Sequence, residues 1–316
     1  MKNGFVFPGQ GSQAVGMGRA LAEEFGEARA VFAAVDEALD QKLSQLMWDG
    51  PESELTLTEN AQPALMAVSM AVVTVLAENG VKLVENAAYV AGHSLGEYSA
   101  LTASGALELE DASRLLKLRG QAMQRAVPVG VGAMAALLGL DFEAVVEVAE
   151  EAGQGEEICA AANDNAVGQV VVSGHAAAVA RAIDLAKERG AKRAMELPVS
   201  APFHCSLMQP AADEMRAALA EAKISAPAVP VIANVCAAPV SDPEEIRQLL
   251  VEQITARVRW RESMIWLADN NAGNLVELGS GKVLATMARR IDPRLTATAL
   301  STPDDIRTYL EETQGD

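Results

Sequence analysis

Residues 87–104, which read AAYVAGHSLGEYSALTAS, form the most informative stretch of this chain. The apolar residues 87–91 predict a short buried strand, and residues 97–104 follow a helical pattern that a glycine ends. Between them, the tight turn 92–96 matches the G-x-S-x-G motif in the strand-turn-helix context that this motif requires. The pattern therefore predicts that Ser94 sits on a sharp turn where a helix begins.

The chemistry of such a turn explains its spacing. Glycines two residues before and two residues after the serine let the strand and the helix approach each other closely. The hydroxyl of Ser94 is then exposed at the N-terminus of the helix, where free N–H groups and the helix dipole stabilise a developing oxyanion. We therefore predict a nucleophilic serine, and an ordinary glycine-rich turn is the structural alternative.

A nucleophilic serine needs a base, and the chain has 3 histidines. His93 adjoins the serine, and neighbouring side chains in a tight turn diverge. His175 follows a Ser-Gly pair and is typical of a residue that starts a helix. By elimination His204, in the segment PFHCS, is the candidate base, although a lone histidine is more often structural. An α/β hydrolase also has an acid before this histidine, and Asp111 and Glu196 are available, but no pattern marks either one.

An arginine occupies the apolar face of the helix predicted over residues 111–126. At about 100° per residue, the face that holds Arg119 also holds Ala112, Leu115, Leu116, Ala122, Met123 and Ala126. A buried guanidinium needs an anionic partner, because an unpaired buried charge is very costly. That partner is either an acidic residue of the core or the carboxylate or phosphate of a substrate. With a nucleophilic serine nearby, the second possibility indicates an acyl group that carries its own carboxylate.

The order of the predicted elements indicates an α/β fold in two parts. Within residues 131–199 the order is βαββαβ, that of a ferredoxin-like subdomain, with a polar turn at 163–165 between two of its strands. The segments on either side alternate strand and helix, as an α/β body does. We therefore expect a body formed by residues 1–130 and 200–316, with residues 131–199 inserted in its middle.

The most apolar part of the chain is a predicted core helix. It runs from Asn60, the expected N-cap, to Asn79, with Pro63 in its first turn. Its longest apolar stretch, residues 63–77, is too short to span a bilayer. The N-terminal residues contain no long apolar run, so we expect no signal peptide.

The composition excludes several classes of protein. The 316 residues carry 25 Lys and Arg against 43 Asp and Glu, and the net charge of −18 opposes binding to nucleic acid or to an anionic membrane. Aromatic residues make up only 4%, too few for a surface that stacks nucleic-acid bases. The 3 cysteines form no C-x-x-C pair, which fits a reducing cytoplasm. No cluster of side chains has metal-ligand spacing, so we expect no metal.

From end to end, the chain resembles the malonyl-CoA:acyl carrier protein transacylases of bacterial type II fatty acid synthesis. The most specific segments are FPGQGSQ and GHSLGEY. The other matching segments are NAQPA at 60–64, LRG at 118–120, Asn163 with QVV at 169–171, SAPFH at 200–204, Gln253 before VRW at 258–260, and ELGSG at 277–281. The resemblance implies a hydrolase-like body with a parallel sheet and an inserted ferredoxin-like subdomain, in agreement with the two parts expected above.

The resemblance also implies roles for the reacting residues. Ser94 would accept the acyl group, and His204 would be its base. The main-chain carbonyl of Gln253 would orient the histidine, which removes the need for a triad acid. The backbone N–H groups of Gln10 and Leu95 would form the oxyanion hole.

Four further residues would bind the substrate if the resemblance holds. Arg119 would bind the malonyl carboxylate, Gln62 would line the acyl pocket, and Asn163 would lie near the pantetheine arm. Phe203 matches the Phe that related acyltransferase domains of polyketide synthases often carry before the histidine when they select malonyl over methylmalonyl units.

The activity implied is a ping-pong transfer of malonyl from malonyl-CoA to acyl carrier protein, through a malonyl-serine intermediate. We expect a cytoplasmic monomer without a cofactor of its own, because the phosphopantetheine belongs to the carrier. Alternatives that stay open are the malonyltransferase subunit of a malonate decarboxylase, a polyketide pathway, a serine hydrolase or thioesterase, and a protein-interaction module without activity.

An acidic carrier and an acidic enzyme need a local basic surface to meet. Two clusters are candidates, and scattered solvated charges are the alternative. The first cluster is Lys187, Arg189, Lys192 and Arg193, and the second is Arg257, Arg259 and Arg261.

Overall fold

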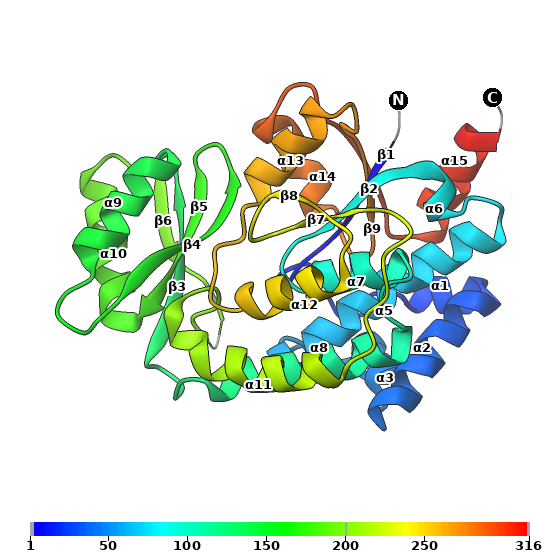
Figure 1. Cartoon of the computed structure of the whole chain (residues 1–316), viewed down its shortest axis with the longest axis horizontal. Coiled ribbons are helices and arrows are strands. Elements are labelled where there is room, and N and C mark those ends of the chain that lie inside the picture. The colour runs from blue at the N-terminus through cyan, green and yellow to red at the C-terminus, as the bar shows by residue number, and fades with distance from the viewer. Residues whose placement is uncertain (1–2, 200, 315–316) are drawn as a thin grey trace.

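The computed structural model describes residues 3–199 and 201–314. Its body is built on a six-stranded sheet of strand order β10-β9-β1-β2-β7-β8, which is parallel except for β8 (Figure 1). The strands are β1 (Asn3–Phe7), β2 (Ala87–Gly92), β7 (Val231–Ala233), β8 (Ala238–Val240), β9 (Asn274–Leu278) and β10 (Thr296–Leu300). The sequence pattern predicts strands over residues 4–7, 87–91, 229–234 and 274–278, which correspond to β1, β2, β7 and β9, and it misses the two edge strands.

Helices cover both faces of this sheet, so its strands are buried on both sides. Along β1, Phe5 and Phe7 belong to one apolar cluster and Val6 belongs to another, because alternate side chains of a strand point to opposite faces. The helices of the body are α1 (Arg19–Glu24), α2 (Gly26–Leu39), α3 (Leu43–Asp49), α4 (Glu52–Leu55), α5 (Thr58–Glu78), α6 (Leu83–Asn86), α7 (Gly96–Ala103), α8 (Leu109–Arg125), η1 (Ser206–Met208, a 3₁₀ turn), α11 (Gln209–Glu221), α12 (Pro243–Glu252), α13 (Trp260–Asp269), α14 (Val283–Ile291) and α15 (Pro303–Gln314).

Helix α5 is the central helix of the body. By length and composition it could cross a membrane, but 83% of its most apolar window is buried inside the protein, so it is a core helix. The prediction that Asn60 caps this helix is wrong. The N-cap is Leu57, and the Asn60 side chain instead donates to the carbonyl of Glu54 at 2.9 Å. Pro63 therefore lies inside α5 rather than in its first turn.

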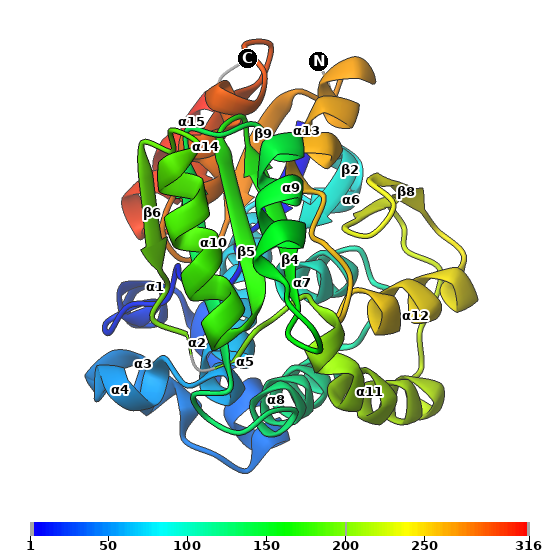
Figure 2. The same cartoon turned by 90° about the vertical axis from the view of Figure 1, so that its left-hand side faces the viewer.

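A separate four-stranded antiparallel sheet has the order β4-β5-β3-β6. Its strands are β3 (Gly132–Leu138), β4 (Cys159–Ala166), β5 (Gln169–His175) and β6 (Arg193–Glu196), and its helices are α9 (Phe142–Ala152) and α10 (Ala176–Glu188). Both helices lie on one face of this sheet, toward the viewer in Figure 2. The predicted order βαββαβ is confirmed. The predicted limits of the subdomain stay a prediction, and Ser200, at one of them, lies outside the described residues.

The polar segment 163–165 is not a turn, as predicted, but part of β4. The backbone N–H of Asp164 donates to the carbonyl of Val258 at 3.0 Å, and the N–H of Val258 donates to the carbonyl of Ala162 at 2.8 Å. Asp164 is fully buried, and its carboxylate pairs with Arg261 at 2.8 Å. These polar groups hold the edge of the small sheet against the body, and this tertiary pairing overrides their low preference for strands.

Candidate active site

The glycine-rich turn after β2 places Ser94 as the sequence predicted. A Cβ on Gly92 would lie 1.8 Å from the Gly96 carbonyl carbon, and a Cβ on Gly96 would lie 2.4 Å from the Phe7 carbonyl oxygen. Only glycine fits at either position. Ser94 itself has φ 53°, in the left-handed region that non-glycine residues rarely adopt. The turn thus holds the serine in a strained conformation at the start of α7, as functional turns often do.

His204 is the histidine that meets the serine. Its Nε2 lies 2.8 Å from the Ser94 Oγ, and its Nδ1 lies 2.8 Å from the main-chain carbonyl of Gln253. A carbonyl only accepts hydrogen bonds, so Nδ1 carries the proton and Nε2 is free to accept the Ser94 hydroxyl proton. No acid completes this pair among the described residues. Asp111 instead pairs with Arg114 on the surface of α8, at 2.7 Å.

The environment keeps His204 neutral. Burial and the nearby positive charge of Arg119 lower the pKa of His204 to about 3. A neutral imidazole is the form that can take a proton from a hydroxyl group. Like Ser94, His204 has a positive φ, 59°, so both members of the pair sit on strained backbone.

The other two histidines lie elsewhere. His93 lines the same cavity as Ser94, but its Nε2 lies 2.8 Å from the Asn165 Oδ1, and burial lowers the pKa of His93. His175 is the N-cap of α10, and its Nδ1 accepts the backbone N–H of Ile158 at 3.0 Å. The elimination that selected His204 from the sequence therefore agrees with the geometry.

Arg119 is buried on the inner face of α8, with 1% of its surface exposed. Its Nη1 donates to the Gln62 Oε1 at 2.8 Å. Its Nη2 donates to the Gln253 Oε1 at 2.9 Å and to the Ser94 Oγ at 3.2 Å. All of these acceptors are neutral, and no acidic side chain of the described residues forms an ion pair with it. The cation next to the reactive hydroxyl is therefore well placed to receive a carboxylate from a ligand.

A buried polar network beneath Ser94 was not predicted from the sequence. Its members are Glu97 of α7, Asn234 after β7 and the side chain of Gln253 after α12. The backbone N–H of Ser94 donates to the Asn234 Oδ1 at 2.8 Å, and Asn234 Nδ2 donates to the Gly92 carbonyl at 2.7 Å. Burial raises the pKa of Glu97 to about 7. The only sign of this network in the sequence is Glu97 itself, an acidic residue on a helix otherwise made of small and apolar residues.

Two residues that line the cavity beside Ser94 have backbone N–H groups without an acceptor among the described residues. Leu95 is the N-cap of α7, and Gln10 lies in the loop after β1. Among the described residues, neither backbone N–H donates to another protein atom. The Ser94 N–H already donates to Asn234, so the N–H groups of Gln10 and Leu95 are the candidates for an oxyanion hole.

These residues line a cavity of about 760 Å³ between the body and the small sheet. The body contributes Ser94, Arg119 and Gln62, and the small sheet contributes Asn163 of β4. Phe203 lies in the wall beside His204. Gln10, Leu95 and His204 also line the cavity, and Gln253 forms hydrogen bonds with Arg119 and His204. The structure thus brings together all nine site residues singled out in the sequence. Within residues 3–199 and 201–314, no group of His, Cys, Asp and Glu side chains is arranged to hold a metal.

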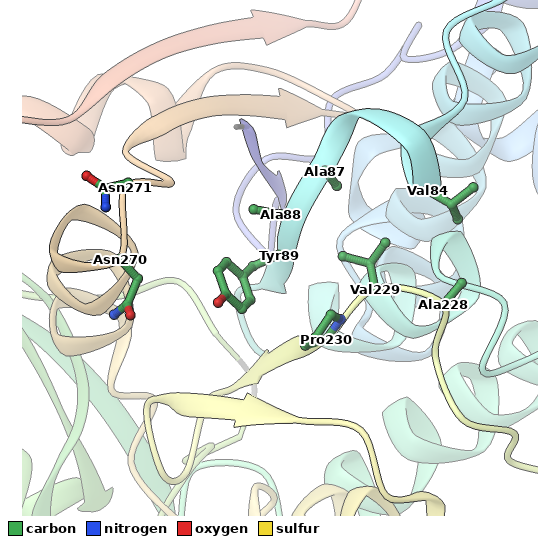
Figure 3. A pocket seen from close by; sticks show the side chains of 9 residues that line it. All are labelled: Val84, Ala87, Ala88, Tyr89, Ala228, Val229, Pro230, Asn270 and Asn271. Carbon is green, nitrogen blue, oxygen red and sulfur yellow. The ribbon is translucent and has the colours of Figure 1, made fainter. Parts of the chain in front are cut away.

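A second hollow of about 480 Å³ lies at the opposite end of β2 (Figure 3). Ala87, Ala88 and Tyr89 at the start of β2 line it, together with Pro230 before β7 and Asn270 after α13. The described residues around it include no acid, base or thiol that could serve as a nucleophile. The cavity at Ser94 is therefore the candidate active site.

Comparison with known proteins shows which family the chain resembles. A family model described as "Acyl transferase domain" matches residues 4–307. The chain is 44% identical over 310 residues to the malonyl CoA-acyl carrier protein transacylase of Bacillus subtilis, covering 98% of this chain and 96% of that protein. The crystal structure of the acyl-carrier-protein-S-malonyltransferase from Bartonella henselae is 53% identical, covers 100% of both chains and has a TM-score of 0.97. A malonyl-transacylase in complex with a type II PKS acyl-carrier protein is 42% identical, with 99% and 100% coverage and a TM-score of 0.95.

Proposed function

The chain belongs to the acyl transferase family, among the malonyl CoA-acyl carrier protein transacylases, and we propose that it transfers malonyl from malonyl-CoA to the phosphopantetheine thiol of an acyl carrier protein. The observation that carries the proposal is a serine hydroxyl that contacts both a neutral histidine and a buried arginine. The serine and the histidine carry out the acyl transfer, and the arginine selects an acyl group that ends in a carboxylate.

In the first half of the reaction, the malonyl group moves from CoA to the enzyme. His204 Nε2 takes the Ser94 proton while Oγ attacks the thioester carbonyl carbon. The backbone N–H groups of Gln10 and Leu95 stabilise the oxyanion. The C–S bond then breaks, His204 returns its proton to the CoA thiolate, and malonyl-Ser94 remains.

In the second half, the carrier replaces CoA. The phosphopantetheine thiol enters the cavity past Asn163 and gives its proton to His204 as its sulfur attacks the malonyl ester. The C–O bond breaks, and the proton passes to Ser94. The products are malonyl-carrier and free enzyme, and no cofactor of the protein takes part. Because the same base serves both halves, it must be neutral at the start of each one.

Intact-protein mass spectrometry tests this cycle directly. After brief mixing with malonyl-CoA, we expect one malonyl adduct, and we expect little adduct with acetyl-CoA. Addition of a phosphopantetheinylated carrier protein should discharge the adduct and produce malonyl-carrier. Release of free malonate without adduct would instead indicate a serine hydrolase. Carriers from fatty acid, polyketide and malonate decarboxylase systems, compared side by side, identify the pathway.

We also propose a cytoplasmic monomer. All 3 cysteines are free thiols, as a reducing compartment allows. The nine candidate site residues come together within a single chain, which supports a monomer as the active unit. Size-exclusion chromatography with light scattering tests the oligomeric state, and an active dimer that loses activity on dilution would contradict it.

The pH dependence of malonyl loading tests the state of His204. The ratio kcat/KM reports ionisations of the free enzyme. Because the pKa of His204 is lowered to about 3 and the base acts when neutral, kcat/KM should stay level through pH 6.5 and fall only at lower pH. In Arg119→Ala the nearby cation is gone, so the pKa of His204 rises and the acidic fall moves to higher pH.

One control separates His204 from its neighbour. Burial raises the pKa of Glu97 to about 7, so this carboxyl also titrates in the range studied. In Glu97→Gln that ionisation is absent. A loss of kcat/KM centred near pH 6.5 in both the wild type and Glu97→Gln would show that His204 keeps an ordinary pKa.

The structure separates the two candidate clusters for carrier docking. In the second cluster, Arg257 and Arg259 pair with Glu262, and Arg261 pairs with Asp164. In the first, Lys187 pairs with Asp184 and Arg189 pairs with two glutamates of α9, Glu147 and Glu151. Lys192 and Arg193 are exposed, and neither forms an ion pair with a described residue. They are the cations of these clusters left free to meet an acidic partner.

Charge reversal at these two residues tests the docking proposal. We expect the double variant Lys192→Glu with Arg193→Glu to raise the KM for the carrier about fivefold or more. Charges at the rim of an interface mainly affect the rate at which the two proteins associate. Malonyl loading from CoA should not change. Lys42→Glu with Lys223→Glu, at two exposed residues outside these clusters, is the control for the same change in net charge. An unchanged carrier KM in the double variant would exclude this surface.

A further inference from the structure

The polar network beneath Ser94 connects the malonyl-binding arginine to the serine turn. Glu97 Oε2 accepts the Gln253 Nε2 at 2.9 Å and the Asn234 backbone N–H at 2.9 Å. The same Gln253 amide nitrogen donates to the Ser94 carbonyl at 3.1 Å. Glu97 is 3% exposed and Gln253 is 0% exposed. Glu97 lies in the first turn of α7, and Gln253 is the residue that caps the end of α12 (Figure 1).

The carboxylate determines which way the Gln253 amide points. An amide has an oxygen that accepts and a nitrogen that donates, and a carboxylate only accepts. Glu97 therefore holds the nitrogen of Gln253 on its own side, and the Gln253 oxygen faces the guanidinium of Arg119 at 2.9 Å. A flipped amide would turn its nitrogen toward the donors of Arg119 and lose all three bonds, to Glu97, Ser94 and Arg119.

The backbone of Gln253 also contacts a residue of the site. Its main-chain carbonyl accepts Nδ1 of His204 at 2.8 Å, while its side chain holds Arg119. A shift of this one residue would move the base and the anion-binding cation together. A displacement of about 1 Å in such a site can cost about 100-fold in rate.

We propose that Glu97 is a positioning residue, which acts through Gln253 to fix both Arg119 and His204 in their reactive geometry. The inference rests on the proposed malonyl transfer and adds to it a residue that touches neither the acyl group nor the reacting atoms. Its second hydrogen bond, from the Asn234 backbone, fixes the residue whose side chain holds the Ser94 N–H. Glu97 thus supports the nucleophile, the base and the selective cation from a single buried oxygen.

The conservative substitution distinguishes this role from a role for negative charge. Glu97→Gln keeps a side-chain oxygen that can accept both hydrogen bonds but removes the charge. We expect it to retain malonyl loading within about threefold of the wild type. Glu97→Ala removes the acceptor, and we expect loading to fall about 100-fold. We also expect the preference for malonyl over acetyl to fall at least tenfold, because Arg119 loses its fixed position.

A double-mutant cycle tests whether Glu97 acts through Gln253. Gln253→Leu removes the side-chain link to Arg119 but keeps the main-chain carbonyl. If Glu97 acts through this link, the malonyl preference of the double variant Glu97→Ala with Gln253→Leu should be no lower than that of Gln253→Leu alone. Additive losses would contradict the proposal. If Glu97→Ala does not fold, the single variant Gln253→Leu still tests the inference. A malonyl preference equal to that of the wild type in Gln253→Leu would overturn the inference.

A matched control comes from another buried carboxylate. Glu277 is fully buried and accepts two backbone N–H groups, from Leu284 at 3.2 Å and Ala285 at 2.8 Å, at the start of α14. Glu277→Ala should lower the melting temperature and leave the malonyl preference unchanged. An equal loss of preference there would mean that Glu97 has only a structural effect.

The same experiment separates the inference from the proposed function. A wild-type protein that forms no malonyl adduct would refute the function. A wild-type protein that loads malonyl normally beside a folded Glu97→Ala with unchanged rate and preference would refute only the positioning role.

Discussion

Replacement of Ser94 by alanine should abolish the malonyl adduct and lower malonyl transfer about 10⁴- to 10⁶-fold, the range seen when a nucleophile of this kind is removed. The loss is large because no other hydroxyl contacts the His204 Nε2 among the described residues. Binding of malonyl-CoA should survive, since Arg119 keeps its bonds to Gln62 and Gln253. Intact-mass analysis gives the adduct, and equilibrium binding gives the affinity.

A serine on the same helix provides the control. Ser99 is buried in α7, and its hydroxyl has no hydrogen-bond partner among the described residues. Ser99→Ala should therefore load malonyl at the wild-type rate. A stable malonyl adduct on the Ser94→Ala protein would show that another residue accepts the acyl group.

Arg119→Ala should remove most of the preference for malonyl. In the wild type, an acetyl group leaves the buried guanidinium without an anionic partner, and an uncompensated buried charge costs about 3–5 kcal/mol. Removal of the cation removes that penalty and also removes the partner of the malonyl carboxylate. We expect the ratio of kcat/KM for malonyl-CoA to that for acetyl-CoA to fall about 10²- to 10³-fold.

The ratio is the decisive quantity, because Arg119 also touches the Ser94 Oγ and its loss slows both substrates. Arg114→Ala is the matched control on the same helix. Arg114 is exposed and pairs with Asp111, so its removal should leave the ratio unchanged. If Arg119→Ala discriminates between the two substrates as the wild type does, the carboxylate binds elsewhere.

Three of the candidate site residues could be found in the sequence because each one could be told apart from its surroundings. Ser94 interrupts a strand-to-helix transition with flanking glycines, and Arg119 interrupts an apolar helix face. His204 remained after two histidines with other uses were set aside. Gln253 and Gln10 carry no such mark, because a role through the backbone does not depend on residue type, and only the family resemblance indicated them.

The remaining features depend on contacts between distant segments. Glu97 is an acid in the first turn of a helix, where acids are common for local reasons. Its partners Gln253 and Asn234 lie more than 130 residues away in the chain. Segment 163–165 was predicted as a turn because its residues disfavour strands, and its pairing with the body outweighs that preference.

The group that orients His204 is a peptide carbonyl, and this determines which mutations can remove it. Every residue type carries that carbonyl, so no point mutation at position 253 can delete it. A carboxylate in the same role would be lost by a single codon change. Here the orienting group depends on the path of the chain just after α12, so a deletion or insertion there threatens it more than a substitution does. This contact of His204 is therefore insensitive to the residue type at position 253, although it still depends on the groups that hold the chain there.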